Sequence, residues 1–279
     1  MLPSAHRFHP RTEILTMNKK ALCIGINDYP GTNNDLSGCV NDANDWAVEL
    51  GKRGFSVTKL LNGQATKSAM VTAIRGLIGA AREGDTLVLT YSGHGTWVPD
   101  SSGDEPDGRD EALCPHDIGT RGPLLDDEIR TLFAALGKGI RLLFLSDSCH
   151  SGSVIRGRED DLDAGGPRAR FMPLEDWMSE DELPRRASPA PRVVSGLRRT
   201  GGDLLLAGCK DTEYSYDTSF QGRANGAFSY YALKTLRERK PANYDVWFNA
   251  IREYLPSSRL AQTPQIMGSA TARRFSVFE

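Results

Sequence analysis

An apolar run at residues 142–145 stops abruptly at Asp147 and Cys149, and this junction limits the folds open to the chain. A short, continuously apolar run predicts a central strand that is buried on both faces of a parallel sheet. In open sheets of parallel strands, ligands and reactive groups gather just beyond the carboxyl ends of the strands. The sequence therefore predicts that Cys149 lies at that edge of a sheet.

A second apolar run, at residues 86–91, ends in the same way, with His94 and Gly95 just beyond it. If the two strands are neighbours, the thiol of Cys149 and the imidazole of His94 meet at one edge. The thiolate is the reactive form of cysteine, and an imidazole can activate it by taking its proton. This pairing predicts a cysteine–histidine hydrolase, in which the backbone N–H groups of Gly95 and Cys149 stabilise an oxyanion.

Asp147 lies two positions before Cys149, so that in a strand both side chains point to the same face. Two interpretations follow. The carboxylate either orients His94, or it belongs to a substrate pocket and selects a basic side chain.

Strand-like and helix-like segments alternate along most of the chain, which predicts an α/β fold with a parallel sheet and right-handed crossovers. Strands are expected at residues 21–26, 55–60, 86–91, 142–147 and 204–209. Helices are expected from Asn41 or Asp42 to Gly54, after a cap at Thr66, and at residues 126–136, 225–239 and 244–255. A long loop is expected at residues 97–122 and an edge strand at residues 275–278.

The composition is that of an ordinary globular protein, with 279 residues, 39% hydrophobic, 25% charged and a formal net charge of -2. This balance gives no general attraction to nucleic acid or anionic membranes, and no apolar stretch approaches the roughly 18 residues of a membrane span. Residues 1–18 lack the apolar core of a signal peptide and are expected to form a disordered tail before one domain at residues 19–279. Five scattered cysteines argue against a disulfide framework and favour a cytoplasmic location.

The segment 156–200 differs from the rest of the chain, because it contains five prolines and nine arginines. Loops of this length within a compact domain are usually functional or disordered. We expect a flexible loop that directly follows Cys149.

Other candidate sites are weaker. Cys149 with His150, and Cys114 with His116, lack the paired spacing of a zinc site. The acidic stretch 104–111 lacks the spacing of an EF-hand, so a solvated loop is favoured over calcium binding.

Taken together, the motifs resemble the metacaspases and orthocaspases, the prokaryotic and non-animal relatives of caspases. The matching segments are Tyr-Ser-Gly-His-Gly at 91–95, Asp-Ser-Cys-His-Ser-Gly at 147–152, and the stretches 36–43, 125–129 and 226–230. The histidine precedes the cysteine by 149 − 94 = 55 residues, close to the roughly 50 of caspases. Asp147 and Ser148 replace the Gln-Ala of animal caspases, which favours the metacaspase branch.

The resemblance implies a caspase-like three-layer α/β/α sandwich with a mostly parallel central sheet. It implies that His94 is the general base and Cys149 the nucleophile. It further implies a pocket for Arg or Lys at the cleaved position, lined by Asp42 and Asp147, with Cys39 and Ser92 beside it. Two carboxylates near one site attract a guanidinium through charge-assisted hydrogen bonds, whereas a pocket for aspartate needs basic groups.

Calcium-dependent relatives carry an acid seven residues after the nucleophile, where this chain has Arg156. Asp110, Asp126 and Asp127 match other acids of that metal site and remain weak calcium candidates. The remaining alternative is that an acid at residues 159–161 takes the place of the missing calcium ligand after a shift in register. We therefore expect no required cofactor and no strong calcium dependence.

The favoured interpretation is a cytoplasmic, monomeric cysteine endopeptidase that cleaves proteins after Arg or Lys. It is expected to be a zymogen controlled by cleavage of the loop at 156–200, either by itself or by an upstream activating protease. No nucleic acid or membrane partner is expected. The alternatives are a solvated, disordered insert for the loop and, for the whole chain, a catalytically idle caspase-like interaction module.

Overall fold

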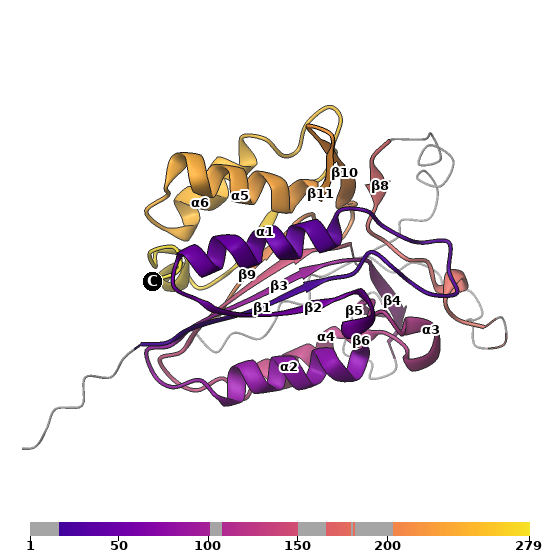
Figure 1. Cartoon of the computed structure of the whole chain (residues 1–279), viewed down its shortest axis with the longest axis horizontal. Coiled ribbons are helices and arrows are strands. Elements are labelled where there is room, and N and C mark those ends of the chain that lie inside the picture. The colour runs from indigo at the N-terminus through magenta and orange to yellow at the C-terminus, as the bar shows by residue number, and fades with distance from the viewer. Residues whose placement is uncertain (1–16, 101–107, 150–165, 180, 182–202) are drawn as a thin grey trace, which may run out of the picture.

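A central six-stranded sheet organises the computed structural model, which describes residues 17–100, 108–149, 166–179, 181 and 203–279 (Figure 1). The strands lie in the order β12-β9-β7-β3-β1-β2. Every neighbouring pair is parallel except β12 and β9. The strands are β1 (Lys19–Gly25), β2 (Ser56–Leu61), β3 (Thr86–Ser92), β7 (Arg141–Asp147), β9 (Asp203–Ala207) and β12 (Gln265–Gly268).

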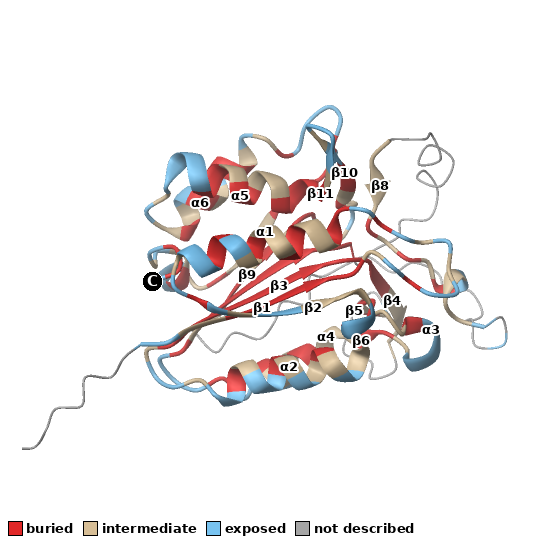
Figure 2. Cartoon of the chain, viewed as in Figure 1, coloured by how far each residue is buried: buried red, intermediate tan, exposed pale blue. Residues whose placement is uncertain are grey.

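Helices cover both faces of this sheet and complete three layers (Figure 1). On one face lie α2 (Lys67–Gly79) and α4 (Asp126–Phe133); on the other lie α1 (Cys39–Lys52), α5 (Ala227–Arg239), α6 (Tyr244–Arg252) and α7 (Ala270–Arg273). Successive side chains of β1 alternate between the two cores, Leu22 packing with α2 and Cys23 with α1. Figure 2 shows the resulting burial of the central strands. The predicted α/β fold with a mostly parallel sheet is confirmed.

The register of two central strands positions the expected site. Ser92, the last residue of β3, pairs with Asp147, the last residue of β7. His94 and Cys149 each follow two residues later, so both residues come immediately after the same edge of the sheet.

Two expectations for the fold are wrong. Residues 97–122 are not one loop: β4 (Gly95–Pro99) and β5 (Arg109–Leu113) pair antiparallel, β6 (Leu124–Leu125) joins them, and α3 (Ile118–Arg121) lies between β5 and β6. The charged and half-exposed residues of this hairpin hid its strand pattern. Residues 275–278 do not form an edge strand, because Val277 and Phe278 pack into the core and Phe278 has a φ of 65°. The edge strand is β12 instead.

A small sheet of three strands, which the sequence did not predict, lies beyond the same edge. Its order is β11-β10-β8, formed by β8 (Arg168–Ala169), β10 (Tyr216–Phe220) and β11 (Arg223–Gly226). β8 belongs to the loop that was expected to be flexible throughout. In this part of the loop, residues 166–179 instead pack against the domain and include a short 3-10 helix, η3 (Leu174–Asp176). A second 3-10 helix, η1 (Asn62–Gln64), follows β2.

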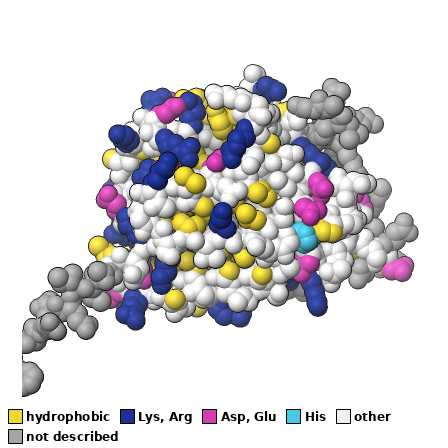
Figure 3. Space-filling view, in the orientation of Figure 1, with side chains coloured by type: hydrophobic (Ala, Val, Ile, Leu, Met, Phe, Trp, Pro, Cys, Tyr) yellow, Lys and Arg dark blue, Asp and Glu magenta, His cyan; other side chains and the backbone are white. Residues whose placement is uncertain are grey.

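None of the helices in the described ranges has the length and apolarity needed to cross a bilayer. On the face shown in Figure 3, basic and acidic side chains lie among small apolar areas. Most of the predicted tail, residues 1–16, lies outside the described residues.

Candidate active site

His94 is a buried imidazole whose hydrogen bonds define its tautomer. Its Nε2 lies 2.6 Å from the carbonyl oxygen of Asn34, and its backbone N–H donates to the Tyr29 hydroxyl at 2.8 Å. A carbonyl oxygen can only accept, so Nε2 carries the proton and Nδ1 keeps its lone pair. Nδ1 is buried and has no hydrogen-bond partner among the described residues. Burial lowers the pKa of His94 to about 3, so the ring is neutral at pH 7 and can act as a base.

Cys149 lies just beyond β7 and is fully buried. Its Sγ accepts a hydrogen bond from the backbone N–H of Ser215 at 2.6 Å and lies 3.3 Å from the Ser215 carbonyl oxygen. Ser215 comes directly before β10, so the small sheet holds the thiol in place. No sequence pattern indicates this contact, because Ser215 is 66 residues away along the chain.

The two N–H groups expected to stabilise an oxyanion converge on a single oxygen atom. Gly95 and Cys149 donate to the backbone carbonyl of Arg170, at 3.0 Å and 3.2 Å. Arg170 is the residue after β8, in the loop that follows the nucleophile. Two backbone N–H donors aimed at one carbonyl oxygen form the geometry that stabilises a developing negative charge there.

The side chain of Arg170 is fully buried in a group of three carboxylates, which we call the carboxylate pocket: Asp42, Asp147 and Asp217. Its guanidinium lies 2.8 Å from Asp42, 2.9 Å from Asp217 and 3.2 Å from Asp147. It also donates to the Ser92 hydroxyl at 2.7 Å. Asp42, Asp147 and Ser92 are three of the residues predicted for this pocket from the sequence, whereas Asp217 is not.

Backbone N–H groups and polar side chains fix the orientation of each carboxylate. Asp42 accepts from the N–H of Gly226 and from the Asn225 amide at 2.8 Å. Asp217 accepts from the N–H of Ser37 at 2.7 Å.

Asp147 is held by the Ser215 hydroxyl at 2.5 Å and by the N–H of Ser229 at 2.8 Å. Its carboxylate therefore faces Arg170, as the pocket interpretation requires.

The charges in the pocket act on one another strongly. Burial raises the pKa of Asp42 to about 7, although the positive charge of Arg170 acts in the opposite direction. Burial alone would lower the pKa of Arg170, but the three carboxylates raise it well above its usual value. Cys39 lies within the field of the same guanidinium, and burial raises its thiol pKa. Without a cation, three buried carboxylates would repel one another, so this pocket favours a positively charged occupant.

The calcium candidates do not assemble into a metal site. Asp126 and Asp127 both form ion pairs with Arg130, at 2.8 Å and 2.5 Å. In the described ranges, no group of three or more His, Cys, Asp or Glu side chains is arranged to hold a metal ion. Asp110 is buried in β5. Arg156 and the acids at 159–161 lie outside the described residues.

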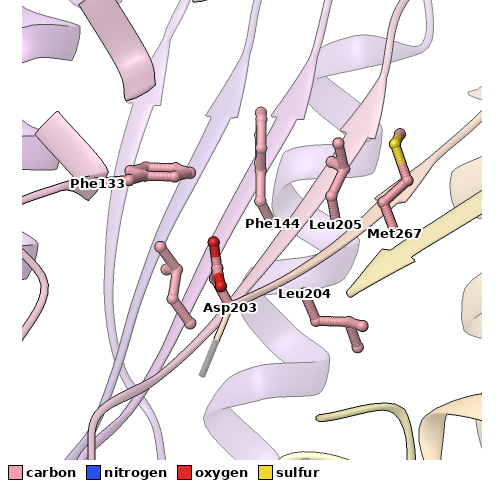
Figure 4. Close-up of a pocket in the computed structure, with 7 residues that line it drawn as sticks. Phe133, Phe144, Asp203, Leu204, Leu205 and Met267 are labelled. Atoms are coloured by element: carbon pink, nitrogen blue, oxygen red, sulfur yellow. The ribbon is translucent and has the colours of Figure 1, made fainter. Parts of the chain in front are cut away.

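A small hollow lies elsewhere, between α4 and the strands β7, β9 and β12 (Figure 4). Leu142 and Asp203, which line it, lie at the amino ends of β7 and β9. Cys149 follows the opposite end of β7. The hollow is therefore separate from the site.

Comparison with known proteins identifies the family. A family model described as the metacaspase peptidase C14 domain matches residues 19–157, a range that includes His94 and Cys149. Metacaspase-1 from Mycosarcoma maydis is 31% identical, over 90% of this chain and 70% of that protein. The chain belongs to the metacaspase family. The resemblance seen in the sequence is thereby confirmed, and the chain is a cysteine-type peptidase.

Other relatives support the same assignment. Metacaspase-1B from Aspergillus oryzae is 32% identical over 95% of this metacaspase and 70% of its own length. The crystal structure of protein GSU0716 from Geobacter sulfurreducens matches with a TM-score of 0.71 and 30% identity, covering 94% of this chain and 98% of that one. The crystal structure of caspase-1 from Spodoptera frugiperda matches with a TM-score of 0.58 and 13% identity, covering 90% of this chain and 86% of that one. The last comparison shows the caspase-like fold.

Proposed function

We propose that this metacaspase is an endopeptidase that cleaves proteins after Arg or Lys, with a His94–Cys149 dyad, and that it is made as a zymogen. One observation carries the proposal. An arginine of the chain itself, Arg170, lies with its guanidinium in the carboxylate pocket and its carbonyl oxygen on the two converging N–H groups. A peptide bound for cleavage after arginine needs both of these contacts at once.

The charge of the pocket supports the choice of residue at the cleaved position. A guanidinium presents five N–H donors in a planar fork, which suits several carboxylates at fixed positions. A lysine ammonium carries the same charge with three donors, so lysine is expected to bind more weakly. An aspartate side chain would be repelled by Asp42, Asp147 and Asp217.

The proposed mechanism uses the His94 imidazole, the Cys149 thiol and the two converging N–H groups. The Cys149 thiol gives its proton to Nδ1 of His94, and the resulting imidazolium keeps its Nε2–H hydrogen bond with the Asn34 carbonyl. The thiolate attacks the carbonyl carbon of the substrate, and the oxyanion is held by the N–H groups of Gly95 and Cys149. His94 then protonates the leaving amine, and water hydrolyses the thioester.

For this mechanism the Cys149 side chain has to turn from Ser215 toward His94. We propose that the intact loop maintains the present arrangement, so that cleavage of the loop controls activity.

We also propose that calcium is not required and that the protein is a cytoplasmic monomer. Arg130 already neutralises Asp126 and Asp127, two of the three acids that would form the site. All five cysteines are unpaired and buried, which is compatible with a reducing compartment. Gel filtration of the purified protein tests the oligomeric state.

A peptide assay tests the specificity directly. Otherwise identical fluorogenic peptides with Arg, Lys or Asp at the cleaved position are compared, each in calcium and in a chelator. We expect Arg peptides to be cut fastest, Lys peptides more slowly, and Asp peptides at least about 1000-fold more slowly, since ion pairs are lost and repulsion is added. The chelator is expected to change these rates less than twofold. Equal cleavage of Arg and Asp peptides contradicts the pocket, and a folded protein that cuts none supports the idle module.

Gly226 offers a test of the pocket that leaves its charges unchanged. A Cβ added there would overlap the Arg170 guanidinium and the Asp147 carboxylate. The φ of Gly226 is -71°, which alanine adopts without strain, so the effect is steric. Gly226→Ala is therefore expected to raise the KM for Arg peptides about tenfold or more. Gly51→Ala is the control, because a Cβ at Gly51 meets nothing within 4 Å; equal KM values in the two variants would contradict the assignment.

A further inference from the structure

We propose that the peptide bond between Arg170 and Phe171 is the bond that this enzyme cuts in itself, and that Arg170 occupies the site as an internal substrate until then. The inference rests on the proposed cleavage after arginine. It goes further, because it selects one bond among the many basic residues of the loop and predicts where the two new ends lie.

The backbone on both sides of this bond is held as a bound peptide would be. On the amino side, β8 pairs antiparallel with β10, and the N–H of Arg170 donates to the Ser215 carbonyl at 2.9 Å. On the carboxyl side, the N–H of Met172 donates to the Gly95 carbonyl at 2.9 Å. Extended peptides bind enzymes and receptors by adding a strand to a sheet edge in this way. The peptide bond between Arg170 and Phe171 is therefore held on both sides by backbone hydrogen bonds to the residues around the site.

The side chains select Arg170 over its neighbour in the loop. The Arg170 guanidinium fills the carboxylate pocket, whereas the Arg168 guanidinium donates to the backbone carbonyls of Asn33 and Asp35. Burial lowers the pKa of His94, and the backbone of Arg170 is one of the groups that act in the opposite direction, so this residue also lies within reach of the imidazole. Side chain, carbonyl oxygen and general base thus meet at one residue.

The chain after the bond is anchored in the core of the domain. Met172 is fully buried, and Leu174 is buried beside it. Asp176 accepts a hydrogen bond at 3.0 Å from Asn34, the residue whose carbonyl orients His94. We therefore expect the new amino terminus at Phe171 to stay docked after the cut.

The reaction follows from these positions. The Cys149 thiol leaves Ser215, passes its proton to Nδ1 of His94, and its sulfur bonds to the carbonyl carbon of Arg170. The C–N bond to Phe171 breaks, and the Phe171 nitrogen takes the proton from His94. Water then hydrolyses the thioester, which regenerates the thiol and leaves a carboxylate on Arg170 and an amine on Phe171.

The cut is expected to free the pocket. The cut removes the covalent link between Arg170 and the anchored segment that begins at Phe171, so the new chain end at Arg170 is free to leave the site. On the amino side, β8 contributes only a two-residue pairing with β10. Because Arg170 is fully buried before the cut, the reaction is expected to occur within one molecule and not between molecules.

The experiment maps new amino termini in the full-length chain by intact mass and terminal sequencing. The wild-type protein and Arg168→Gln are expected to yield a terminus at Phe171, and Arg170→Lys the same terminus more slowly. Cys149→Ala and Arg170→Gln are expected to yield none, with folding checked by circular dichroism. The rate is expected to stay constant over a fiftyfold range of protein concentration, and Cys149→Ala mixed with wild type is expected to stay uncut at Phe171.

Two results would overturn the inference: a wild-type protein that cuts itself elsewhere and leaves this bond intact, or Arg170→Gln that is still cut before Phe171. Rapid cleavage of Cys149→Ala by added wild type would overturn the intramolecular step. An Arg peptide assay on the same samples separates the proposals. Peptide cleavage without a Phe171 terminus refutes only this inference, whereas a Phe171 terminus without peptide cleavage supports it and refutes the endopeptidase acting on other proteins.

Discussion

Replacing Cys149 with alanine is expected to reduce kcat/KM for Arg peptides by at least about four orders of magnitude, as loss of a catalytic nucleophile does in other peptidases. The sulfur is the atom that forms the bond to the substrate carbonyl. Its removal leaves only the N–H donors and the carboxylate pocket, which bind the substrate without breaking the bond. Kinetics with Arg peptides measure the loss, and circular dichroism is expected to show an unchanged fold.

His94→Ala is expected to lower kcat/KM by roughly 10²–10⁴, the usual contribution of a general base. A readout besides activity is alkylation of Cys149 by iodoacetamide, which requires the thiolate. Without His94 the rate of alkylation at pH 7 is expected to fall, because no neighbouring base takes the proton of the thiol. For the Cys149→Ala variant, Cys23→Ala is the matched control. Cys23 is buried in β1, and burial raises the pKa of its thiol to about 11, so it is not expected to react. An activity loss in Cys23→Ala as large as in Cys149→Ala would contradict the assignment of the nucleophile.

The placement of His94 and Cys149 at one edge of the sheet could be predicted because it depends on features that are local in sequence. Two buried runs of apolar residues end at glycine-rich segments, and parallel neighbours bring such ends to one edge. The pairing of Ser92 with Asp147 then places His94 and Cys149 at equivalent positions, each two residues beyond the end of its strand. The pattern could not supply the hydrogen bonds that orient them, because Asn34 and Ser215 lie 60 and 66 residues away from their partners.

The third acid of the pocket was missed for a related reason. Asp217 lies in β10, a short strand with polar residues and no apolar alternation, and it reaches the amino end of α1 across 180 residues of sequence. The role of Arg170 could not be predicted for a different reason. The arginine-rich loop indicated that the chain carries residues suited to its own pocket, but nine similar arginines gave no basis for choosing one. Within the described part of the loop, the backbone contacts of Arg170 and the place of its guanidinium in the carboxylate pocket distinguish it from Arg168.

The three acids belong to different parts of the chain, and this arrangement provides a physical basis for the control of catalysis by the loop that we propose. Asp42 lies in α1 and Asp147 in β7, whereas Asp217 lies in the small sheet that also contains β8. Ser215, which comes just before β10, contacts the Cys149 sulfur, the Asp147 carboxylate and the Arg170 N–H. If the loop controls activity as we propose, Ser215 and β10 are the elements through which a change in the loop would reach the thiol and the pocket.

Substitutions in the carboxylate pocket provide the second large effect that we expect. Asp147→Ala removes an ion-pair partner of the bound arginine and also the acceptor for Ser215 and Ser229. Charged hydrogen bonds contribute about 1.5–3 kcal/mol each, so we expect Asp147→Ala to lower kcat/KM for Arg peptides by about 100-fold or more. Circular dichroism is expected to show that the fold is kept.

Asp217→Asn changes one atom of the pocket and is expected to lower kcat/KM for Arg peptides about 10- to 100-fold, mainly through KM, since it removes a charge at 2.9 Å from the guanidinium. Because self-cleavage uses the same pocket, the Phe171 terminus is expected to form more slowly in this variant. Asp245→Asn is the control, an acid in the first turn of α6 that lies outside the pocket. If Asp217→Asn and Asp245→Asn cut Arg peptides equally well, Asp217 does not recognise the substrate, and its contact with Arg170 serves only to hold the loop.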